Sequence, residues 1–235
     1  YQSPEFIIDK TSPSLEVTYD NQSNQNDNYY ASKRAATIKI TETNFDPERI
    51  KITGTKDGKA EDFPKITEWT SDGDVHTTTV LFEKDGYYTV EVSGNDKAGN
   101  GIHETFSETF HIDTLAPDIK INGVENEKAY NGDVIPSVTI TDTNLDTESV
   151  AVSVTGVKTG ENNKFKNTVT KENGKVTIDF EGFPKTQNFD DIYNISVTAK
   201  DKSGNDIKAE KKFSVNRFGS TFELDEATAA LNNNY

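Results

Sequence analysis

The sequence predicts an all-β protein built from two tandem antiparallel β-sandwiches, and three observations support this prediction. The chain of 235 residues repeats three short blocks in the same order. Apolar and polar residues alternate over short runs, which is the period of a strand with one buried face. Turn signals rich in Asn and Gly separate several of these runs.

The internal repeat sets the number of domains. The block FIIDKTSP at 6–13 returns as FHIDTLAP at 110–117, and ITETNFD at 40–46 returns as ITDTNLD at 140–146. A third block, DKAGN at 96–100, returns as DKSGN at 201–205. Such a spacing indicates two homologous domains of about 100 residues. We predict that residues 1–10 are the end of a preceding unit or a linker. The two repeats are predicted at 11–113 and 114–216, and residues 217–235 are predicted to be the start of a further truncated unit or a tail.

Each repeat is predicted to contain strands rather than helices. In the second repeat we expect seven of them, near 118–122, 134–141, 148–155, 164–170, 175–180, 192–199 and 207–215. Seven short strands in about 100 residues is the number typical of an immunoglobulin-like sandwich. The linker between the repeats is short and contains Pro, so we expect an extended arrangement. Acidic residues followed by Ala at 225–231 give the only helical pattern.

Two tyrosines have the sequence context of a structural corner. Tyr88 and Tyr193 each follow an Asp by three residues, at the start of the sixth predicted strand. This resembles the tyrosine corner of Greek-key sandwiches, in which the hydroxyl bonds to nearby backbone. We therefore interpret both tyrosines as structural residues.

Composition and charge exclude several classes of function. Hydrophobic residues make up only 32% of the chain, which favours two small cores over one large enzyme core. The net charge of −15 argues against binding to nucleic acid or to an anionic membrane surface. The absence of Cys excludes thiol catalysis and thiolate metal sites. There is no apolar run of about 18 residues that could span a membrane, and the lack of Met predicts a mature or excised piece.

The repeated blocks resemble bacterial immunoglobulin-like repeats of large surface proteins in Gram-positive, Firmicutes-type bacteria. The resemblance covers residues 5–216 and rests on the Phe-x-x-Asp-x-x-x-Pro and Asp-Lys-Ala/Ser-Gly-Asn blocks. It implies an extracellular protein, either secreted or on the cell surface. Such repeats mostly act as stalks that carry an adhesive or catalytic head, and some bind ligands themselves.

The sequence offers no recognisable set of catalytic groups. His76 and His103 have polar neighbours that suggest solvent exposure, and His111 replaces Ile7 of the first repeat. None of the three has a nucleophile or a metal-binding partner at a known spacing. The acidic pairs at 61–62 and 190–191 are interpreted as solvated loop residues rather than glycosidase carboxylates. We therefore predict no catalytic residue and no enzymatic activity.

Recurring acidic residues suggest a possible calcium site. Acids recur at three equivalent positions in the two repeats, at 9 and 113, 42 and 142, and 96 and 201. Either they bond to backbone amides in turns, or they supply the oxygen ligands that calcium requires. For calcium we expect a site near the junction of the repeats, with Asp96, Asp113 and Asp142 as candidate ligands. No other cofactor is expected.

The first repeat also carries a candidate ligand-binding patch. An Asn- and Gln-rich segment at 19–30 ends in Tyr29 and Tyr30, and the only Trp, Trp69, has no counterpart in the second repeat. Aromatic and amide side chains suit sugar recognition, although the simpler interpretation, a polar loop and a Trp on a sheet face, is preferred. This repeat holds 10 Lys and Arg against 19 Asp and Glu, a net charge of −9, whereas residues 114–216 have −3. It is therefore the better candidate for binding a cation.

Two functions remain open at this stage. The favoured one is a monomeric structural spacer with an adhesion-associated role. The alternative is a carbohydrate- or protein-binding module that uses Trp69, Tyr29 and Tyr30. For the module, the expected partner is a host or cell-wall glycan or protein.

Overall fold

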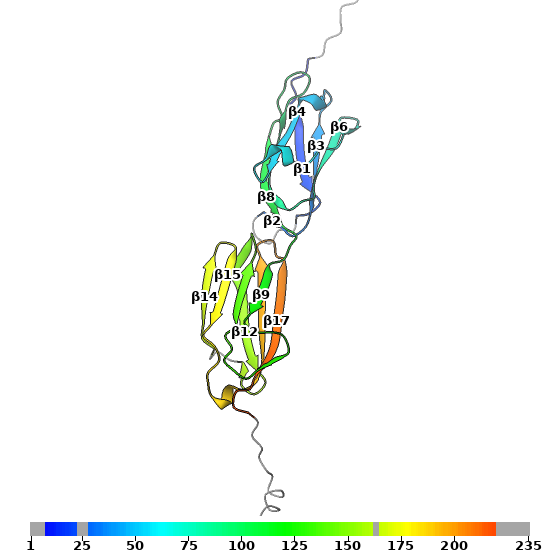
Figure 1. Cartoon of the computed structure of the whole chain (residues 1–235). Coiled ribbons are helices and arrows are strands. Elements are labelled where there is room, and N and C mark those ends of the chain that lie inside the picture. Colours follow the sequence, from blue (N-terminus) through cyan, green and yellow to red (C-terminus); the bar gives the residue numbers. More distant parts are fainter. Residues whose placement is uncertain (1–7, 23–27, 162–164, 220–235) are drawn as a thin grey trace, which may run out of the picture. The chain divides into compact units, whose positions relative to one another are not determined.

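The computed structural model describes residues 8–22, 28–161 and 165–219, and it confirms the predicted all-β fold (Figure 1). The chain divides into two compact units, Tyr1–Ala116 with Asp201–Asn205, and Pro117–Lys200 with Asp206–Tyr235. Each unit contains two packed sheets of mainly antiparallel strands. The helical pattern expected at 225–231 and most of the segment expected to precede the first repeat lie outside the described residues.

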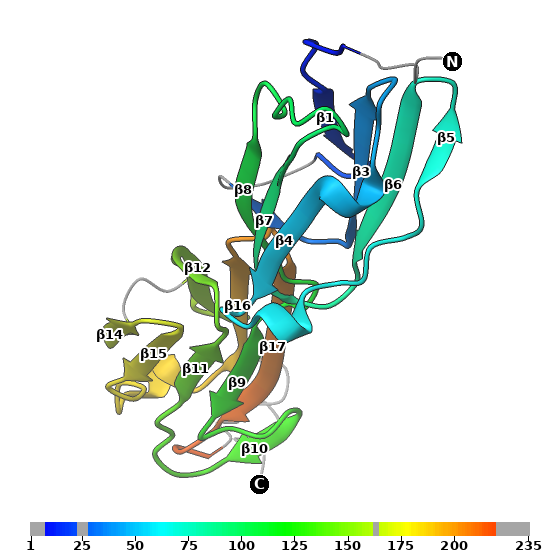
Figure 2. The same cartoon turned by 90° about the horizontal axis from the view of Figure 1, so that it is seen from above.

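The first unit is a sandwich of two four-stranded sheets, which appear as separate layers in Figure 2. One sheet has the order β1-β3-β6-β5, with strands Ser14–Tyr19, Arg34–Thr41, Val75–Phe82 and Thr70–Asp72. The other has the order β2-β8-β7-β4, with strands Tyr29–Tyr30, Phe106–Ile112, Gly86–Gly94 and Ile50–Lys56. Strand β2 pairs in parallel with β8, and the other pairings are antiparallel.

The second unit repeats this topology with one added short strand. One sheet has the order β14-β15-β11-β9, with strands Asn167–Glu172, Lys175–Phe180, Ser137–Thr141 and Asp118–Asn122. The other has the order β10-β17-β16-β12-β13, with strands Lys128–Tyr130, Asp206–Val215, Ile192–Asp201, Leu145–Gly156 and Gly160–Glu161. Strand β11 begins three residues later than predicted, directly after Pro136, which has no amide to donate to a sheet.

Alternation along the strands builds the two cores. In β3 every second side chain, including Ala36 and Ile38, is fully buried, and Val138 and Ile140 in β11 repeat this pattern. Aromatic rings fill the space between the sheets, with Phe82, Tyr88 and Phe110 in the first unit. Short 3-10 helices lie in the connections at Pro47–Arg49, Ala60–Asp62 and Gln187–Phe189.

Both corner tyrosines bond to the backbone four residues upstream. The Tyr88 hydroxyl donates to the Lys84 carbonyl at 2.8 Å, and the Tyr193 hydroxyl donates to the Phe189 carbonyl at 2.7 Å. Both rings are almost completely buried, and burial raises the pKa of each to about 12. Each tyrosine therefore fixes the chain where it enters β7 or β16.

A buried arginine distinguishes the first unit. The Arg34 guanidinium lies 3.7 Å from the ring centroids of both Tyr19 and Tyr30. It also donates to Glu108 Oε1 at 3.3 Å and to the Asn21 carbonyl at 3.1 Å. Planar stacking and fixed donors make Arg suited to such a place between rings. The second repeat has Val134 near the equivalent position, so this arrangement belongs to the first repeat alone.

Candidate functional site

The third repeated block forms the same closed loop twice. We call residues 96–100 and 201–205 the late loops. In the first, Asp96 Oδ1 accepts from the Asn100 backbone amide and Asp96 Oδ2 accepts from Asn100 Nδ2, both at 2.8 Å. The Asp96 amide in turn donates to the Asn100 carbonyl at 3.1 Å. The Asp and Asn of the block therefore close a ring of hydrogen bonds around the loop.

The second late loop reproduces this ring. Asp201 accepts from the Asn205 backbone amide at 2.9 Å and from Asn205 Nδ2 at 2.6 Å. The Gly between them has φ of +94° in both loops, at Gly99 and Gly204. That backbone conformation disfavours any residue with a side chain. The conformation of the loop thus explains three of the four residue types that the two blocks share: Asp, Gly and Asn.

The same asparagine also holds the peptide that precedes a repeat. We call the stretches beginning at Asp9 and Asp113 the leading segments. Asn100 Nδ2 donates to the Asp9 carbonyl at 3.3 Å. Within the first unit, Asn205 Nδ2 donates to the Asp113 carbonyl at 2.8 Å and to the Leu115 carbonyl at 3.2 Å. Each late loop therefore bonds to a leading segment through its Asn amide.

Three carboxylates gather beside the first late loop. One oxygen from each of Asp9, Glu42 and Asp96 lies within 4.8 Å of the others. Asp9 and Glu42 also border a cavity of about 330 Å³. Hard cations such as calcium prefer clustered carboxylate oxygens of this kind.

Amide donors already occupy much of this carboxylate group. Asp9 accepts from the Thr11 amide at 2.9 Å and from Asn44 Nδ2 at 2.8 Å. Glu42 Oε1 accepts from the Asn44 amide at 2.7 Å. The bond from Thr11 and then the bond from Asn44 hold the pKa of Asp9 below its usual value. The geometry therefore fits turn capping directly, and a cation would have to share these oxygens with the amides.

The predicted metal ligands do not all belong to the group of Asp9, Glu42 and Asp96. Asp96 belongs to the group with Asp9 and Glu42, and Asp113 is not part of that group. Asp113 Oδ1 accepts from the Leu115 amide at 3.2 Å, as Asp9 accepts from Thr11. Asp142 lies in the second unit, where its Oδ1 accepts from the Asn144 amide at 2.6 Å.

The pKa of Asp9 is shifted downward, whereas the pKa of Asp201 is shifted upward. Burial raises its pKa, and the nearby negative charge of Asp113 adds to this shift, while the hydrogen bonds from Asn205 oppose it. Asp201 is 2% exposed, so its carboxylate depends on those bonds to remain charged. Loss of the Asn205 side chain would therefore leave the buried Asp201 carboxylate with fewer donors.

The three candidate ligand-binding aromatics do not form one patch. Tyr30 is 4% exposed and packs edge-to-face on Phe110, so its ring is not available for stacking on a ligand. Tyr29 stacks on His111 with ring centroids 4.3 Å apart. Trp69 is half-buried and contacts Phe45 at 4.9 Å, next to the edge strand β5 of the other sheet.

His76 and His111 pack against other side chains of the first unit. His76 was expected to be solvated but is buried, with Nδ1 2.7 Å from Ser71 Oγ and Nε2 2.9 Å from the Glu42 carbonyl. This expectation was wrong because β6 turns the side chain towards Phe45, whose ring stacks on it at 3.9 Å. His111 is half-buried between Tyr29 and Tyr87, and burial lowers its pKa. His103 is exposed.

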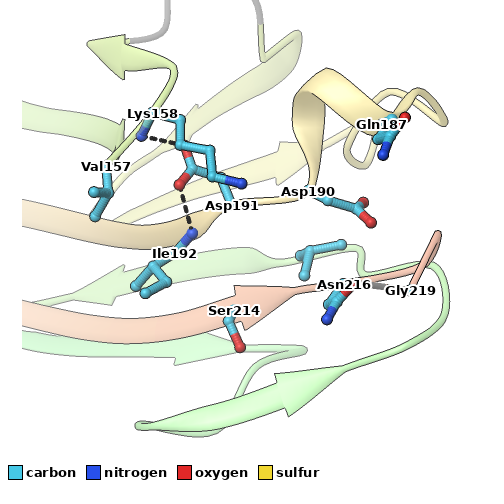
Figure 3. Close-up of a pocket in the computed structure, with 10 residues that line it drawn as sticks. Val157, Lys158, Gln187, Asp190, Asp191, Ile192, Ser214, Asn216 and Gly219 are labelled. Carbon is cyan, nitrogen blue, oxygen red and sulfur yellow. Dashed lines mark hydrogen bonds between the residues drawn. The ribbon is translucent and has the colours of Figure 1, made fainter. Parts of the chain in front are cut away.

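The acidic pair of the second unit was also expected to be solvated and is buried instead. Asp191 Oδ2 accepts from the Lys158 amide at 2.8 Å, and Oδ1 accepts from the Ile192 amide (Figure 3). Oδ2 also accepts from the Thr159 amide at 2.9 Å. Burial by itself would raise the pKa of Asp191, but these bonds outweigh it and the pKa is lowered. The carboxylate therefore ties β16 to the turn after β12.

The neighbouring Asp190 fixes the chain that leaves β17. We call residues 216–219 the trailing segment. Asp190 Oδ2 accepts from the Arg217 and Phe218 amides at 2.5 and 3.0 Å, and Oδ1 accepts from Arg217 Nε at 3.1 Å. Arg217 also donates to the Phe183 and Pro184 carbonyls. The trailing segment is thus bound to its own sandwich by a buried ion pair.

A cavity of about 530 Å³ borders the trailing segment, and Figure 3 shows its lining. Lys158, Gln187 and Asn216 contribute polar side chains, and Val157 and Ile192 contribute apolar ones. Ile192 in β16 pairs with Ser214 in β17. In the first unit, Tyr87 in β7 and His111 in β8 form the equivalent pair.

Sequence reasoning missed the residues that carry most of these contacts. Asn100 and Asn205 were visible as part of a repeated block, but their amides were not assigned a role. Arg34 and Arg217 gave no periodic signal, because each acts through contacts that depend on distant strands. The repeated Asn beside each repeated Asp was the one signal that could have pointed to the loop bonds.

Solved structures similar to this chain include a fragment of the titin I-band, with a TM-score of 0.41, 15% identity, and coverage of 88% of this chain and 66% of that one. An adhesin of Yersinia pseudotuberculosis has a TM-score of 0.36, 13% identity, and coverage of 85% and 58%. The titin domains solved with telethonin have a TM-score of 0.29, 13% identity, and coverage of 91% and 100%. The chain thus spans about two thirds or less of two of these structures. No curated protein matches it.

The family assignment rests on the sequence profile. The profile described as bacterial Ig-like domain (group 3) matches residues 80–216, which is more than half of the chain. This range contains the final strands of the first unit and the strands of the second. Among the described residues, no helix is long and apolar enough to cross a membrane. The chain belongs to the bacterial Ig-like domain (group 3) family.

Proposed function

We propose that the chain is a structural spacer in the adhesion-associated repeat region of an extracellular bacterial protein, secreted or attached to the surface of a Gram-positive cell. The observation that carries this proposal is the bond from each late-loop Asn to a leading segment, from Asn100 to Asp9 and from Asn205 to Asp113. A spacer needs a defined chain direction at the ends of each repeat. Amide-to-carbonyl bonds supply such a constraint where a Gly- or Ser-rich linker would not.

The bonds at the other end of a sandwich support the same function. Asp85 and Asp190 each precede a corner tyrosine by three residues. Asp85 Oδ2 accepts from Thr114 Oγ1 at 3.1 Å, and Asp190 accepts from Arg217. Thr114 and Arg217 occupy equivalent places after the last strand of each repeat. One repeated acid therefore holds the outgoing chain, while the late-loop Asn holds an incoming one.

A ligand-binding module is the second candidate, and the stack of Tyr29, His111 and Tyr87 favours it. The ring centroids of Tyr29 and His111 lie 4.3 Å apart, those of Tyr87 and His111 lie 4.7 Å apart, and Tyr87 is 38% exposed. An exposed aromatic surface of this kind suits a sugar ring or an apolar side chain of a protein partner. This version of the module uses Tyr29 without Tyr30 or Trp69.

A binding screen separates the two functions. The purified chain is tested on a glycan array and against cell-wall glycans and host surface proteins, together with Tyr29→Ala and Tyr87→Ala. A spacer gives no saturable binding, or binding that both variants retain. Saturable binding that both variants lose, with Trp69→Ala as the matched aromatic control that retains it, would establish the module and reject the spacer as the main function.

Calcium binding by Asp9, Glu42 and Asp96 is a further proposal for the first unit, carried by the approach of their oxygens to within 4.8 Å. Bound calcium would offset repulsion between the three carboxylates and stabilise the native state by mass action. Isothermal titration with calcium, beside melting curves with and without chelator, tests this. A calcium-dependent rise in melting temperature that Glu42→Gln removes supports the site. No heat and no change in melting temperature leave turn capping as the account of these residues.

We also propose that the chain has no enzymatic activity. The buried His76 and the buried acids Asp190 and Asp191 have their polar atoms engaged by backbone and side-chain partners. Turnover of a glycan or peptide substrate that is lost on His76→Ala or Asp190→Asn, in variants that remain folded, would overturn this.

A further inference from the structure

The trailing segment of the second unit lies in a place that the repeat pattern relates to the leading segments. The sequences FIID at 6–9, FHID at 110–113 and FSVN at 213–216 occupy equivalent positions, each ending in Asp or Asn. The carbonyl of the last residue accepts a bond from a late-loop Asn at both Asp9 and Asp113. The third equivalent carbonyl is that of Asn216.

The backbone of Asn216 is fixed as that of Asp113 is fixed. The Asn216 amide donates to the Tyr130 carbonyl at 2.8 Å, and the Asp113 amide donates to the Tyr30 carbonyl at 3.0 Å. Strands β10 and β17 pair in parallel next to this point, as β2 and β8 do in the first unit. Because the local pairing is the same, Asp113 and Asn216 are held in the same way, each directly after the final strand of its unit.

The residues that follow are held as well. Asp190 fixes the amides of Arg217 and Phe218, and Asp85 bonds to Thr114 at the corresponding place. The Asn216 carbonyl is therefore anchored on both sides, by Tyr130 before it and by Asp190 after it. An anchored acceptor loses little conformational entropy when a partner binds, which favours recognition.

The surface around Asn216 has room for a loop. The cavity of about 530 Å³ includes Asn216, Gln187 and Lys158, and its apolar wall contains Val157 and Ile192, which are 75% and 44% exposed (Figure 3). In the first unit, the larger rings of Tyr87 and His111 stand where Ile192 and Ser214 stand here. The exposed apolar wall and the amide side chains suit a partner with both polar and aliphatic groups.

We propose that this cavity is the docking site for the late loop of another immunoglobulin-like repeat, one that carries the Asp-Lys-x-Gly-Asn block. The Asn amide of that loop donates to the Asn216 carbonyl, as Asn205 donates to Asp113 in the first unit. The Lys of the loop lies near Ala129 of β10, because the Lys202 ammonium lies 5.7 Å from the ring centroid of Tyr29, the equivalent residue of β2. The inference rests on the proposed spacer function and names the kind of partner that the spacer binds.

A chain with one added repeat tests the proposal. A second copy of residues 117–216 is joined after Gly219, so that three residues separate Asn216 from the added Pro, as three separate Asp113 from Pro117. Asn216–Arg217 is the only Asn-Arg pair in the sequence. Labelling Asn carbonyls with ¹³C and Arg amides with ¹⁵N therefore gives a single NMR signal that reports the Asn216 carbonyl.

The expected result is a downfield shift of the Asn216 carbonyl in the extended chain. The shift is lost when the Asn205 equivalent in the added copy is changed to Ala, and it remains when the exposed Asn131 of the same copy is changed to Ala. An equal shift in the Asn205→Ala and Asn131→Ala forms overturns the proposal.

A second variant guards against misfolding of the altered loop. Val157→Glu in the middle repeat leaves the added loop intact and places a charge in the cavity wall. The account predicts loss of the carbonyl shift in this variant too, and an unchanged shift contradicts docking in the cavity. Neither negative result affects the spacer proposal, which is tested on the chain without the added repeat.

Discussion

Asn100 Nδ2 donates both to Asp96 Oδ2 and to the Asp9 carbonyl, and so joins a loop near the end of a repeat to the segment that begins it. The bond to Asp9 joins residues that are 91 positions apart in the sequence. The same side chain at Asn205 joins Asp201 to Asp113. A single residue type, which follows a Gly with positive φ, thus makes the same contact at both late loops.

Removing this amide should loosen the leading segment. We expect Asn100→Ala to destabilise the first unit by about 1–3 kcal/mol, because it leaves the buried Asp96 carboxylate with fewer donors. Hydrogen exchange should accelerate at Thr11, whose amide bonds to Asp9. Asn131→Ala, at an exposed loop position, is the matched control. Unchanged exchange at Thr11 in Asn100→Ala would show that the bond does not hold the segment.

The corner tyrosines should act through their hydroxyls. Tyr88→Phe and Tyr193→Phe keep the buried ring but remove the bond to the Lys84 or Phe189 carbonyl. We expect each to lower the free energy of unfolding by about 1 kcal/mol, measured by urea denaturation. Tyr87→Phe, next to Tyr88 but partly exposed, should change it by less than about 0.5 kcal/mol. Equal effects at Tyr87 and Tyr88 would contradict the corner assignment.

Arg34 should stabilise the first unit through its contacts with two tyrosine rings and with the Glu108 carboxylate. We expect Arg34→Met to destabilise it by about 3 kcal/mol, because the change removes the bonds to Glu108 and Asn21 and the contacts with two tyrosine rings. Arg49→Met removes a half-exposed ion pair with Asp46 and should cost less than about 1 kcal/mol. Thermal melts of both variants make the comparison, and equal losses would argue against a special role for Arg34.

Acid should weaken the second unit through Asp190 and Asp191. Both carboxylates have a pKa below the usual value in the folded state. Their stabilisation is therefore complete above the unfolded pKa of about 3.9 and is lost as the pH falls through the lower folded value. Asp191→Asn should lower stability at pH 7 by about 2 kcal/mol and reduce the further loss on acidification. An identical pH dependence in the variant would rule out Asp191 as a contributor.

The sequence predicted the strands and the tandem repeat because both leave periodic signals in neighbouring residues. The alternation at Ile38 and Val138, and the Asp before each corner tyrosine, are local features. Contacts of side chains across the sandwich have no such signature. His76 and Asp191 looked like solvated polar residues, and only the pairing of distant strands buries them against Phe45 and the turn at Lys158. Tyr30 was likewise indistinguishable from the neighbouring Tyr29, although alternation along β2 buries one ring and leaves the other partly exposed.

The central claim, that the two repeats form a spacer whose leading segments are held by the late-loop asparagines, is tested most directly by ¹⁵N NMR relaxation of the 26.1 kDa chain. The account predicts that the amides of Thr11 and Leu115, one in each leading segment, have order parameters as high as those of the strands. It also predicts that Asn100→Ala lowers the order parameter of Thr11 and Asn205→Ala lowers that of Leu115, while Asn131→Ala leaves both unchanged. Low order parameters at Thr11 and Leu115 in the unaltered chain would contradict it.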